Sequence, residues 1–261
     1  MRGRTKLISI ATMLSIIFIA SAVFASGLVN VSKTSLLGYT PMLPDAGESI
    51  FVDPSKIIVD YINNPGYQIG NTLSVHVNVS SVTDLFSYQV NVTWSPSMLN
   101  YTGVTYGDFL ARTGSSYGTS RIEPTVFASN VTGFASIAET ILGNVGGISG
   151  GGRLFTIQFK IIGYGSTTIN LSGAGTLPTT LLNSAGGSMA FTAANGFFRN
   201  KIIGDIDGDH DVDGVDFGRF APSYGSIIGW PKYDPECDLD YDGGIDGVDF
   251  GLFAPNYGRS F

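Results

Sequence analysis

The sequence contains a single cysteine, Cys237, among its 261 residues. One cysteine excludes any disulfide bond within the chain, so the fold must depend on its hydrophobic core and on any metal that it binds. Cys237 lies just before an acidic segment. We therefore expect its side chain to be buried there rather than to form a disulfide bond with another chain.

Histidine and basic residues are also scarce, since the chain has two histidines, and Lys and Arg together number 14. Without a basic patch, nucleic acid is not an expected partner. We find no Ser-His-Asp set, nucleotide-binding glycine loop or zinc-ligand spacing. The 8 acidic residues of positions 1–200 are scattered and form no obvious pair of the glycosidase kind. We expect no enzyme activity, and a hydrolase is the least supported function class.

Long apolar runs are absent except at the N-terminus, where basic residues precede an apolar run from Leu7 to Ala20. Small residues follow this run, as in a secretory signal peptide. We assign residues 1–25 to a signal peptide and expect a secreted protein, extracellular or associated with the cell surface. The run is nearly long enough to span a membrane, so an uncleaved anchor is the alternative. Residues 26–50 are expected to be a linker that ends in a short strand.

Six Asn-x-Ser/Thr sequons are candidate glycosylation sites of an exported protein. Two of them, Asn78 and Asn91, fall on the polar face of predicted strands, where a glycan could be accommodated. In a chain rich in Ser and Thr, several sequons arise by chance. The six are Asn30, Asn78, Asn91, Asn100, Asn130 and Asn170.

Residues 51–199 show short alternations of apolar and polar residues, which predict β-strands. Gly, Pro, Asn and Ser separate these segments, and no amphipathic helix is evident. The pattern predicts a mainly β domain, a two-sheet sandwich or jelly roll. The glycine-rich run 143–152 is predicted to be a mobile loop. The predicted strands are 56–62, 73–79, 86–94, 98–105, 125–130, 134–142, 154–162 and 167–171.

Residues 201–261 hold 13 acidic and 4 basic residues, a net charge of −9. A disordered acidic tail would avoid Ile, Val, Phe and Tyr, which this segment contains. Within it, segments 205–216 and 238–249 place carboxylates at positions 1, 3, 5, 9 and 12, the spacing of a twelve-residue EF-hand loop. Position 7 of such a loop adds a backbone carbonyl. The predicted ligands of two Ca²⁺ ions are Asp205, Asp207, Asp209, Asp211, Asp213 and Asp216 in the first loop, and Asp238, Asp240, Asp242, Gly244, Asp246 and Asp249 in the second.

Position 6 of the loop is normally a glycine, and the first loop has His210 there while the second has Gly243. Histidine tolerates a positive φ better than most residues, and Gly208 can share the bend. Because five carboxylates in one loop repel each other without a metal, we expect calcium binding to be coupled to folding.

The segment 213–225 matches the segment 246–258 at a fixed offset of 33 residues, which indicates a duplicated unit of one loop and one helix. Each predicted helix carries two phenylalanines three positions apart, which should pack between the two units. Pro222 and Pro255 are expected to end the helices. Val212 and Ile245, at position 8 of each loop, are predicted to form the backbone bridge between the loops.

This duplicated array, residues 200–261, resembles a dockerin, the calcium-dependent domain that binds cohesins. The resemblance implies that partner-binding residues lie at loop positions 10 and 11 and on the following helix. They would be Gly214, Val215 and Arg219 in one half, and Gly247, Val248 and Leu252 in the other. Either half could dock, and the difference between Arg219 and Leu252 is expected to bias the choice.

The β domain resembles a cohesin in three segments, 71–79, 94–110 and 150–160. Together the two resemblances imply a secreted, non-catalytic assembly protein that binds the cohesin or dockerin domains of other secreted proteins or of further copies of itself. Head-to-tail self-assembly into a homopolymer is then an open outcome. The alternative is a carbohydrate-binding sandwich that binds polysaccharide through aromatics such as Trp94 and is tethered by its dockerin.

Overall fold

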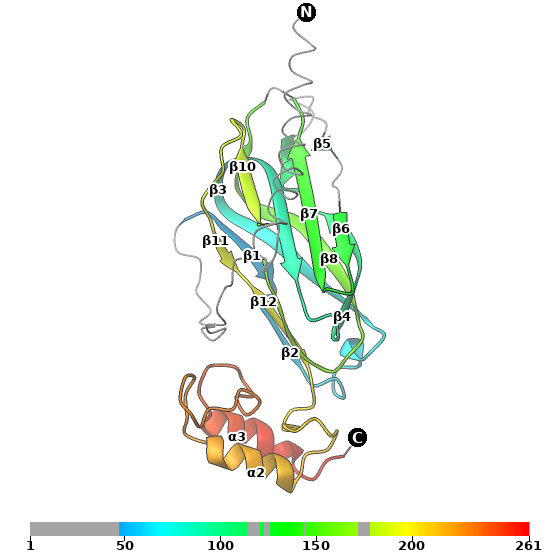
Figure 1. The fold of residues 1–261 in the computed structure, drawn as a ribbon, viewed down its shortest axis with the longest axis vertical. Helices are drawn as coiled ribbons and strands as arrows, with labels where there is room; N and C mark the ends of the chain where they lie inside the picture. The colour runs from blue at the N-terminus through cyan, green and yellow to red at the C-terminus, as the bar shows by residue number, and fades with distance from the viewer. Residues whose placement is uncertain (1–46, 114–120, 123–125, 144, 172–177, 261) are drawn as a thin grey trace, which may run out of the picture. The chain divides into compact units, whose positions relative to one another are not determined.

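The structure is a computed structural model that describes residues 47–113, 121–122, 126–143, 145–171 and 178–260 (Figure 1). The chain divides into two compact units, which we describe separately. In the described residues, the β unit comprises 47–58 and 69–199, and the loop-helix unit comprises 59–68 and 200–260. The predicted signal peptide 1–25, most of the predicted linker 26–50 and the sequon at Asn30 lie outside the described residues.

The β unit is built from strands that alternate with short turns, and the predicted mainly β sandwich is confirmed (Figure 1). The 3₁₀ turn η3 (Leu110–Thr113) follows β4, and a second one, η2 (Pro65–Tyr67), lies in the segment 59–68 that belongs to the loop-helix unit. The strands are β1 (Ser49–Asp53), β2 (Lys56–Val59), β3 (Thr72–Thr93), β4 (Leu99–Tyr106), β5 (Arg121–Ile122), β6 (Val126–Ser129), β7 (Phe134–Ile141), β8 (Ile148–Ile161), β9 (Gly165–Ile169), β10 (Thr180–Asn183), β11 (Thr192–Ala194) and β12 (Gly196–Asn200).

Strand β3 organises the sandwich because its two halves pair with different strands. Its first half pairs antiparallel with β1 and β8, and its second half with β7 and β10. Between the halves the register with β8 shifts, and Ser81 and Asp84 have positive φ angles of 57° and 64°. Bulges of this kind bend a strand and increase its twist. A second, three-stranded sheet has the order β2, β12, β9.

The core lies beneath the alternating apolar residues of β3. Val75 and Val77 are fully buried, while Ser74 before them is exposed and His76 between them is half-buried. Trp94 is also buried, with its ring edge-on to Phe159 at 4.9 Å and its indole N–H donating to the Leu99 carbonyl at 2.7 Å. A buried, satisfied Trp94 belongs to the core and offers no face for stacking a sugar ring.

The glycine-rich run 143–152 was predicted to be a loop, and this prediction is wrong for its second half. Strand β8 begins at Ile148, and its first residues pair with β3, Gly150 opposite Val82 and Gly152 opposite Val79. A Cβ added at Gly147 would lie 2.3 Å from the Asp84 carbonyl oxygen. Gly147 therefore allows two backbones to approach closely, a role that composition alone does not distinguish from flexibility.

Two further predictions for the β unit need correction. Segments 73–79 and 86–94 were predicted as separate strands, and they form the single strand β3. Asn91 was placed on the polar, accessible face of its strand, but its side chain is fully buried. Its backbone N–H donates to the Thr179 hydroxyl at 3.0 Å, because the chain next to β10 covers this part of β3. The other sequons of the described residues remain untested as glycosylation sites.

The loop-helix unit contains two short helices, α2 (Gly214–Ser223) and α3 (Gly247–Phe253), the latter followed by a 3₁₀ turn, η4 (Ala254–Asn256). Helix α2 ends one residue after Pro222, and Pro255 lies within η4. Among the described residues, no helix is long and apolar enough to cross a bilayer. The unit also includes the segment 59–68, which we had expected in the β domain.

The two helices pack through their aromatic residues, as the repeat predicts. The rings of Phe220 and Phe253 stack with centroids 5.2 Å apart, and both side chains are buried. The rings of Phe217 and Phe250 lie at the edges of this pair, 6.1 Å from Phe253 and 6.2 Å from Phe220 respectively, and stay partly exposed. The small unit therefore has a core made of side chains from both repeats.

The predicted bridge between Val212 and Ile245 is wrong. The Val212 N–H donates to the Arg259 carbonyl at 2.8 Å, and the Gly258 N–H donates to the Val212 carbonyl at 2.7 Å. Ile245 makes the equivalent bonds with Gly225 and Ser226, at 2.7 and 2.9 Å. Each loop thus pairs with the segment that follows the helix of the other repeat.

Candidate functional site

The two acidic loops share one backbone conformation, although their sequences differ at the sharp turn. Positions 4 and 6 both have positive φ in each loop, 87° at Gly208 and 77° at His210, then 59° at Tyr241 and 95° at Gly243. Only glycine adopts this region without cost, so each loop has one favourable and one strained position. The predicted bend at His210 is confirmed, whereas the equivalent strain at Tyr241 was not foreseen.

Aspartate side chains hold this conformation by accepting hydrogen bonds from the loop backbone. Asp205 accepts from the Gly208 N–H at 2.7 Å, and Asp238 accepts from the Gly243 N–H at 3.0 Å. Such bonds between Asp and the backbone two to five residues ahead favour turns over helix or strand. They keep neighbouring carboxylates on the inner side of the loop.

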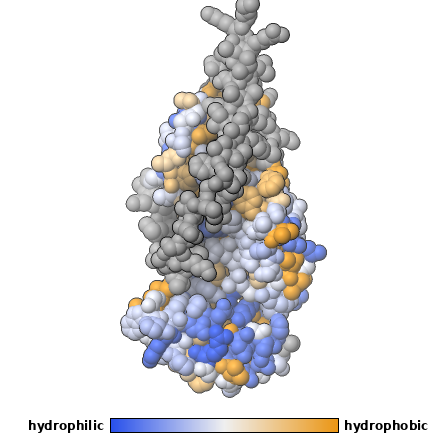
Figure 2. Space-filling model, in the orientation of Figure 1, coloured by the Kyte–Doolittle hydropathy of each residue, from blue (hydrophilic) through white to orange (hydrophobic). Residues whose placement is uncertain are grey.

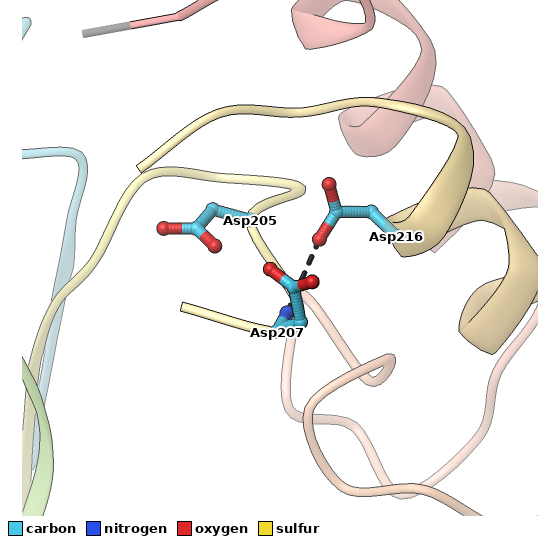
Figure 3. Close-up of side chains that lie close together, drawn as sticks. All are labelled: Asp205, Asp207 and Asp216. Atoms are coloured by element: carbon cyan, nitrogen blue, oxygen red, sulfur yellow. Dashed lines mark hydrogen bonds between the residues drawn. The ribbon is translucent and has the colours of Figure 1, made fainter. Parts of the chain in front are cut away.

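The twelfth residue closes each loop from the first turn of the helix. Asp216 is fully buried, and its carboxylate accepts a hydrogen bond from the Ile206 N–H at 2.6 Å. The same carboxylate points toward Asp207 in Figure 3 and accepts a hydrogen bond from the Asp207 N–H at 3.1 Å. Its second oxygen accepts from the Asp213 N–H at 2.8 Å. Asp213 in turn caps α2 by accepting from the Val215 N–H, so the pair forms a capping box.

Asp249 repeats this arrangement in the second loop. Its oxygens accept from the Leu239 N–H at 2.6 Å and from the Asp246 N–H at 2.7 Å, and Asp246 caps α3. Because the twelfth residue joins the start of the loop to the start of the helix, anything that orders the loop also orders the helix.

Carboxylate oxygens of the predicted ligands converge in three groups within the described residues. In each group the oxygens lie within 4.8 Å of one another. Clustered carboxylate oxygens are suitable ligands for a hard cation. Calcium, for example, binds six to eight oxygens at about 2.3–2.6 Å. The groups are Asp205, Asp207 and Asp216; Asp211, Asp213 and Asp216; and Asp238, Asp240 and Asp249.

The electrostatics of the loops follow from this crowding. Burial, and then the charge of neighbouring carboxylates, raises the pKa of Asp207, Asp211, Asp240 and Asp249 above the usual range of aspartate. A raised pKa means that the ionised carboxylates have a higher free energy in the folded loop than in water. A cation among these oxygens would remove that cost.

Other predicted ligands are not part of these groups. Asp209 accepts from the Asp211 N–H at 3.1 Å, and Asp242 accepts from the Gly244 N–H at 2.8 Å, so both carboxylates support the turn. Asp246 serves as the cap of α3. Gly244 was predicted to bind through its backbone carbonyl, and these groups contain side-chain oxygens only, so that prediction stays a prediction. In the described residues, the first loop therefore gathers more carboxylates than the second.

The predicted partner-binding residues are mostly exposed and form equivalent pairs on the two helices. Val215 and Val248 are each 56% exposed, and Gly214 and Gly247 are exposed beside them. Leu252 is half-buried. On the face seen in Figure 2, hydrophilic residues of this unit, in blue, lie beside smaller hydrophobic patches, in orange. The two helices thus offer matched apolar side chains next to acidic loops.

Arg219, a predicted partner-binding residue, also makes bonds within the loop-helix unit. Its guanidinium donates to the Ile206 carbonyl at 2.9 Å and forms an ion pair with Asp234 at 2.8 Å. These bonds connect α2 to the first loop and to the segment between the repeats. Leu252, its counterpart, has no charge and cannot make such bonds.

Two tyrosines next to the loops were missed by the sequence analysis. Tyr233 donates to Asp238 at 2.6 Å, and Tyr61 lies with its hydroxyl 3.2 Å from the His210 imidazole Nδ1. Tyr233 stands five residues before the second loop, so its proximity in sequence was a usable signal. Tyr61 stands 149 residues before His210, and no local pattern could have linked them.

Cys237 is expected to be unreactive in the folded protein. Its side chain is fully buried, and this burial raises the pKa of the thiol to about 12. Because the thiolate is the reactive form, Ellman's reagent should not react at about pH 8. One thiol per chain should react once guanidinium unfolds the protein, which serves as the control. Rapid reaction of the folded protein would contradict the burial of this side chain.

Comparison with known proteins identifies the family to which the β unit is similar. Residues 61–191 match the sequence model of the cohesin domain, which confirms the predicted cohesin resemblance. No curated protein matches the chain in sequence. The solved structures that resemble it include a non-cellulosomal cohesin from the archaeon Archaeoglobus fulgidus, with 18% identity over 59% of this chain and 90% of that chain and a TM-score of 0.42.

Two bacterial structures are similar to the same extent. A type II cohesin module of an adaptor scaffoldin from Acetivibrio cellulolyticus has 17% identity over 58% of this chain and 89% of that chain, with a TM-score of 0.45. A type I cohesin–dockerin complex from Clostridium thermocellum has 12% identity over 59% of this chain and 98% of that chain, with a TM-score of 0.44. The residues that match the cohesin domain, 61–191, make up half of the 261-residue chain, and the protein therefore belongs to the cohesin family.

Proposed function

We propose that this protein is a secreted, non-catalytic assembly protein that carries a cohesin domain and a calcium-folded dockerin on one chain. Membership of the cohesin family supports the assembly function. The proposal of a calcium-folded dockerin rests on one observation: carboxylate oxygens converge within 4.8 Å in both copies of the duplicated loop. Each loop is followed by a helix that presents the same exposed residues as its counterpart, Val215 or Val248.

The residues of the loop-helix unit define how a cation would act on docking. Calcium would supply positive charge among the carboxylates of each loop. Asp216 and Asp249 join the start of each loop to the start of its helix, and Asp213 and Asp246 cap the helices. Ordering of the loops therefore orients α2 and α3, which hold the exposed apolar side chains toward a partner.

A second copy of this chain is one partner that fits the proposal. A cohesin and a dockerin on one chain form a heterologous contact, in which two different surfaces meet. Contacts of this kind close into rings or continue as open filaments. Another secreted protein that carries a cohesin or a dockerin would use the same surfaces.

Multi-angle light scattering after size-exclusion chromatography of the full chain tests the proposal. In excess calcium the mass is expected to increase with protein concentration, and in EDTA the protein is expected to be a monomer. The double variant Val215→Asp/Val248→Asp should weaken association by at least about tenfold, since a charge placed in the apolar centre of an interface must be desolvated. Both residues are changed because either half could dock.

Two outcomes would limit or contradict the proposal. A monomer at high concentration in excess calcium would exclude self-assembly and leave only a different secreted partner. Association that is unchanged in the double variant, while calcium binding is intact, would show that the helix faces are not the docking surface. The variant Ile69→Asp is the matched control, because Ile69 is 49% exposed and belongs to the β unit.

A further inference from the structure

The loop-helix unit contains a segment that is far from its helices in the sequence. Residues 60–68, which we call the clasp, lie between β2 and β3, yet they group with residues 200–260 rather than with the strand that follows. In the described residues, the loop-helix unit is therefore built from two separate pieces of the chain. The proposed function uses only the second piece and leaves the clasp without a role.

Polar groups within the clasp hold its conformation. Asp60 is buried, and its carboxylate accepts from the Ile62 N–H at 2.8 Å and from the Asn63 side-chain amide at 2.9 Å. The Asp60 carbonyl accepts from the Asn64 N–H, also at 2.9 Å. An aspartate that accepts from the backbone two residues ahead favours a turn. The next side chain, that of Tyr61, is therefore attached to an ordered backbone.

Contacts near both ends of the clasp connect it to the second piece of the unit. The Asn200 side-chain amide donates to the Tyr67 carbonyl at 3.0 Å, at the point where the second piece begins. Tyr61 is buried, and its hydroxyl lies 3.2 Å from Nδ1 of His210. His210 is position 6 of the first acidic loop and stands 149 residues after Tyr61. The clasp therefore reaches the sharp turn of that loop.

His210 is a residue whose backbone needs support from its surroundings. Its φ of 77° is unfavourable for any residue except glycine, and such strain persists only where neighbouring groups hold the residue in place. A tyrosine hydroxyl both donates and accepts, so Tyr61 can bond the imidazole in either tautomer. Position 6 of the second loop is Gly243, which adopts a φ of 95° without this cost and has no side chain to hold.

We propose that Tyr61 is a positioning residue for the first acidic loop, and that the loop and the clasp order each other through the contact with His210. Coupling of this kind is reciprocal, so whatever stabilises the loop also stabilises the clasp by the same factor. Calcium in the first loop would then order the chain segment that leads from β2 to β3. This last step rests on the proposed function, whereas the coupling of Tyr61 to His210 does not.

Amide hydrogen exchange of the full chain in calcium, followed by nuclear magnetic resonance, tests the coupling. The variant Tyr61→Phe removes the hydroxyl and keeps the ring. We expect it to speed exchange about two- to tenfold, the effect of one hydrogen bond, at the amides of Ile62 and Asn64 in the clasp. The amides of Gly208 and Asp211 in the first loop should change by a similar factor, although they are far away in the sequence.

A double-mutant cycle separates the coupling from a local effect of Tyr61. The variant His210→Gly removes the imidazole and gives the first loop the residue that the second loop has. It should speed exchange in the clasp about as much as Tyr61→Phe does, and the double variant should be no faster than either single variant, because both remove one contact. Tyr224→Phe is the control, since Tyr224 is 52% exposed in the same unit, and it should change neither segment.

The outcomes distinguish this inference from the proposed function. If Tyr61→Phe speeds exchange in the clasp alone, or if its effect adds to that of His210→Gly, then Tyr61 does not position the loop and the inference is wrong. If EDTA speeds exchange within 201–260 and leaves the clasp protected, calcium acts without the clasp and the inference is again wrong. If EDTA changes neither segment, the proposed function fails, and the cycle alone still decides whether Tyr61 and His210 are coupled.

Discussion

Removal of calcium is expected to unfold the loop-helix unit while the β unit stays folded. Residues 201–261 carry a net charge of −9, and their carboxylates crowd into the two loops. At a calcium concentration a thousandfold above Kd, each bound ion stabilises the folded state by about 4 kcal/mol. A core of this size rarely supplies more than about 3–5 kcal/mol, so loss of two ions should exceed the stability of the unit.

Differential scanning calorimetry and limited proteolysis with chymotrypsin would measure this effect. In calcium, both units should resist the protease, and in EDTA the chain should be cut within 200–261 while a core fragment of the β unit survives. Magnesium in place of calcium is the control for a general salt effect, because magnesium demands a smaller octahedral site. An unchanged melting profile and cleavage pattern in excess EDTA would contradict calcium-coupled folding.

The second large effect is expected from the aromatic core between the two helices. Phe220 and Phe253 are each 1% exposed, and their rings stack. Replacing either with alanine removes a buried ring and leaves a cavity, which typically costs about 3–5 kcal/mol. This loss is as large as the free energy of unfolding expected of so small a core. Phe220→Ala and Phe253→Ala should therefore unfold the unit at low calcium concentration and weaken its apparent calcium affinity.

The same helices provide matched controls. Phe217 and Phe250 precede the buried pair by three residues and are 44% and 46% exposed. Phe217→Ala and Phe250→Ala should cost about 1 kcal/mol, measured as the change in the melting transition of the calcium-loaded unit. If all four variants lost the same free energy of unfolding, the aromatic residues would not pack as one core with a buried centre and an exposed edge.

Much of the site could be predicted from the sequence because it is local. The carboxylates that converge in each group belong to one run of twelve residues, and the capping box of each helix lies within four residues. The 33-residue repeat also predicts that the two halves have the same shape. The alternation of β3 predicts its buried face in the same way, since side chains of a strand alternate between its faces.

Other features could not be predicted, because they depend on which distant segments meet. Asn91 looks exposed by alternation, but the chain near Thr179 covers it. The glycines of 148–152 look like a loop by composition, but the partner strand β3 draws them into a strand. Arg219 is predicted as a docking residue by its position, and no local pattern shows that it also pairs with Asp234, 15 residues away.

Taken by itself, the sequence determined that the chain is mainly β with a duplicated acidic loop and helix at its end, because periodicity and ligand spacing act over a few residues. Tertiary structure alone decided that each loop pairs with the end of the other repeat, through Val212 and Ile245. It also decided that one oxygen of Asp211 is buried with no hydrogen-bond donor among the residues that the structure describes. The loop pairing depends on backbone hydrogen bonds between segments about 20 or more residues apart, which no local pattern specifies.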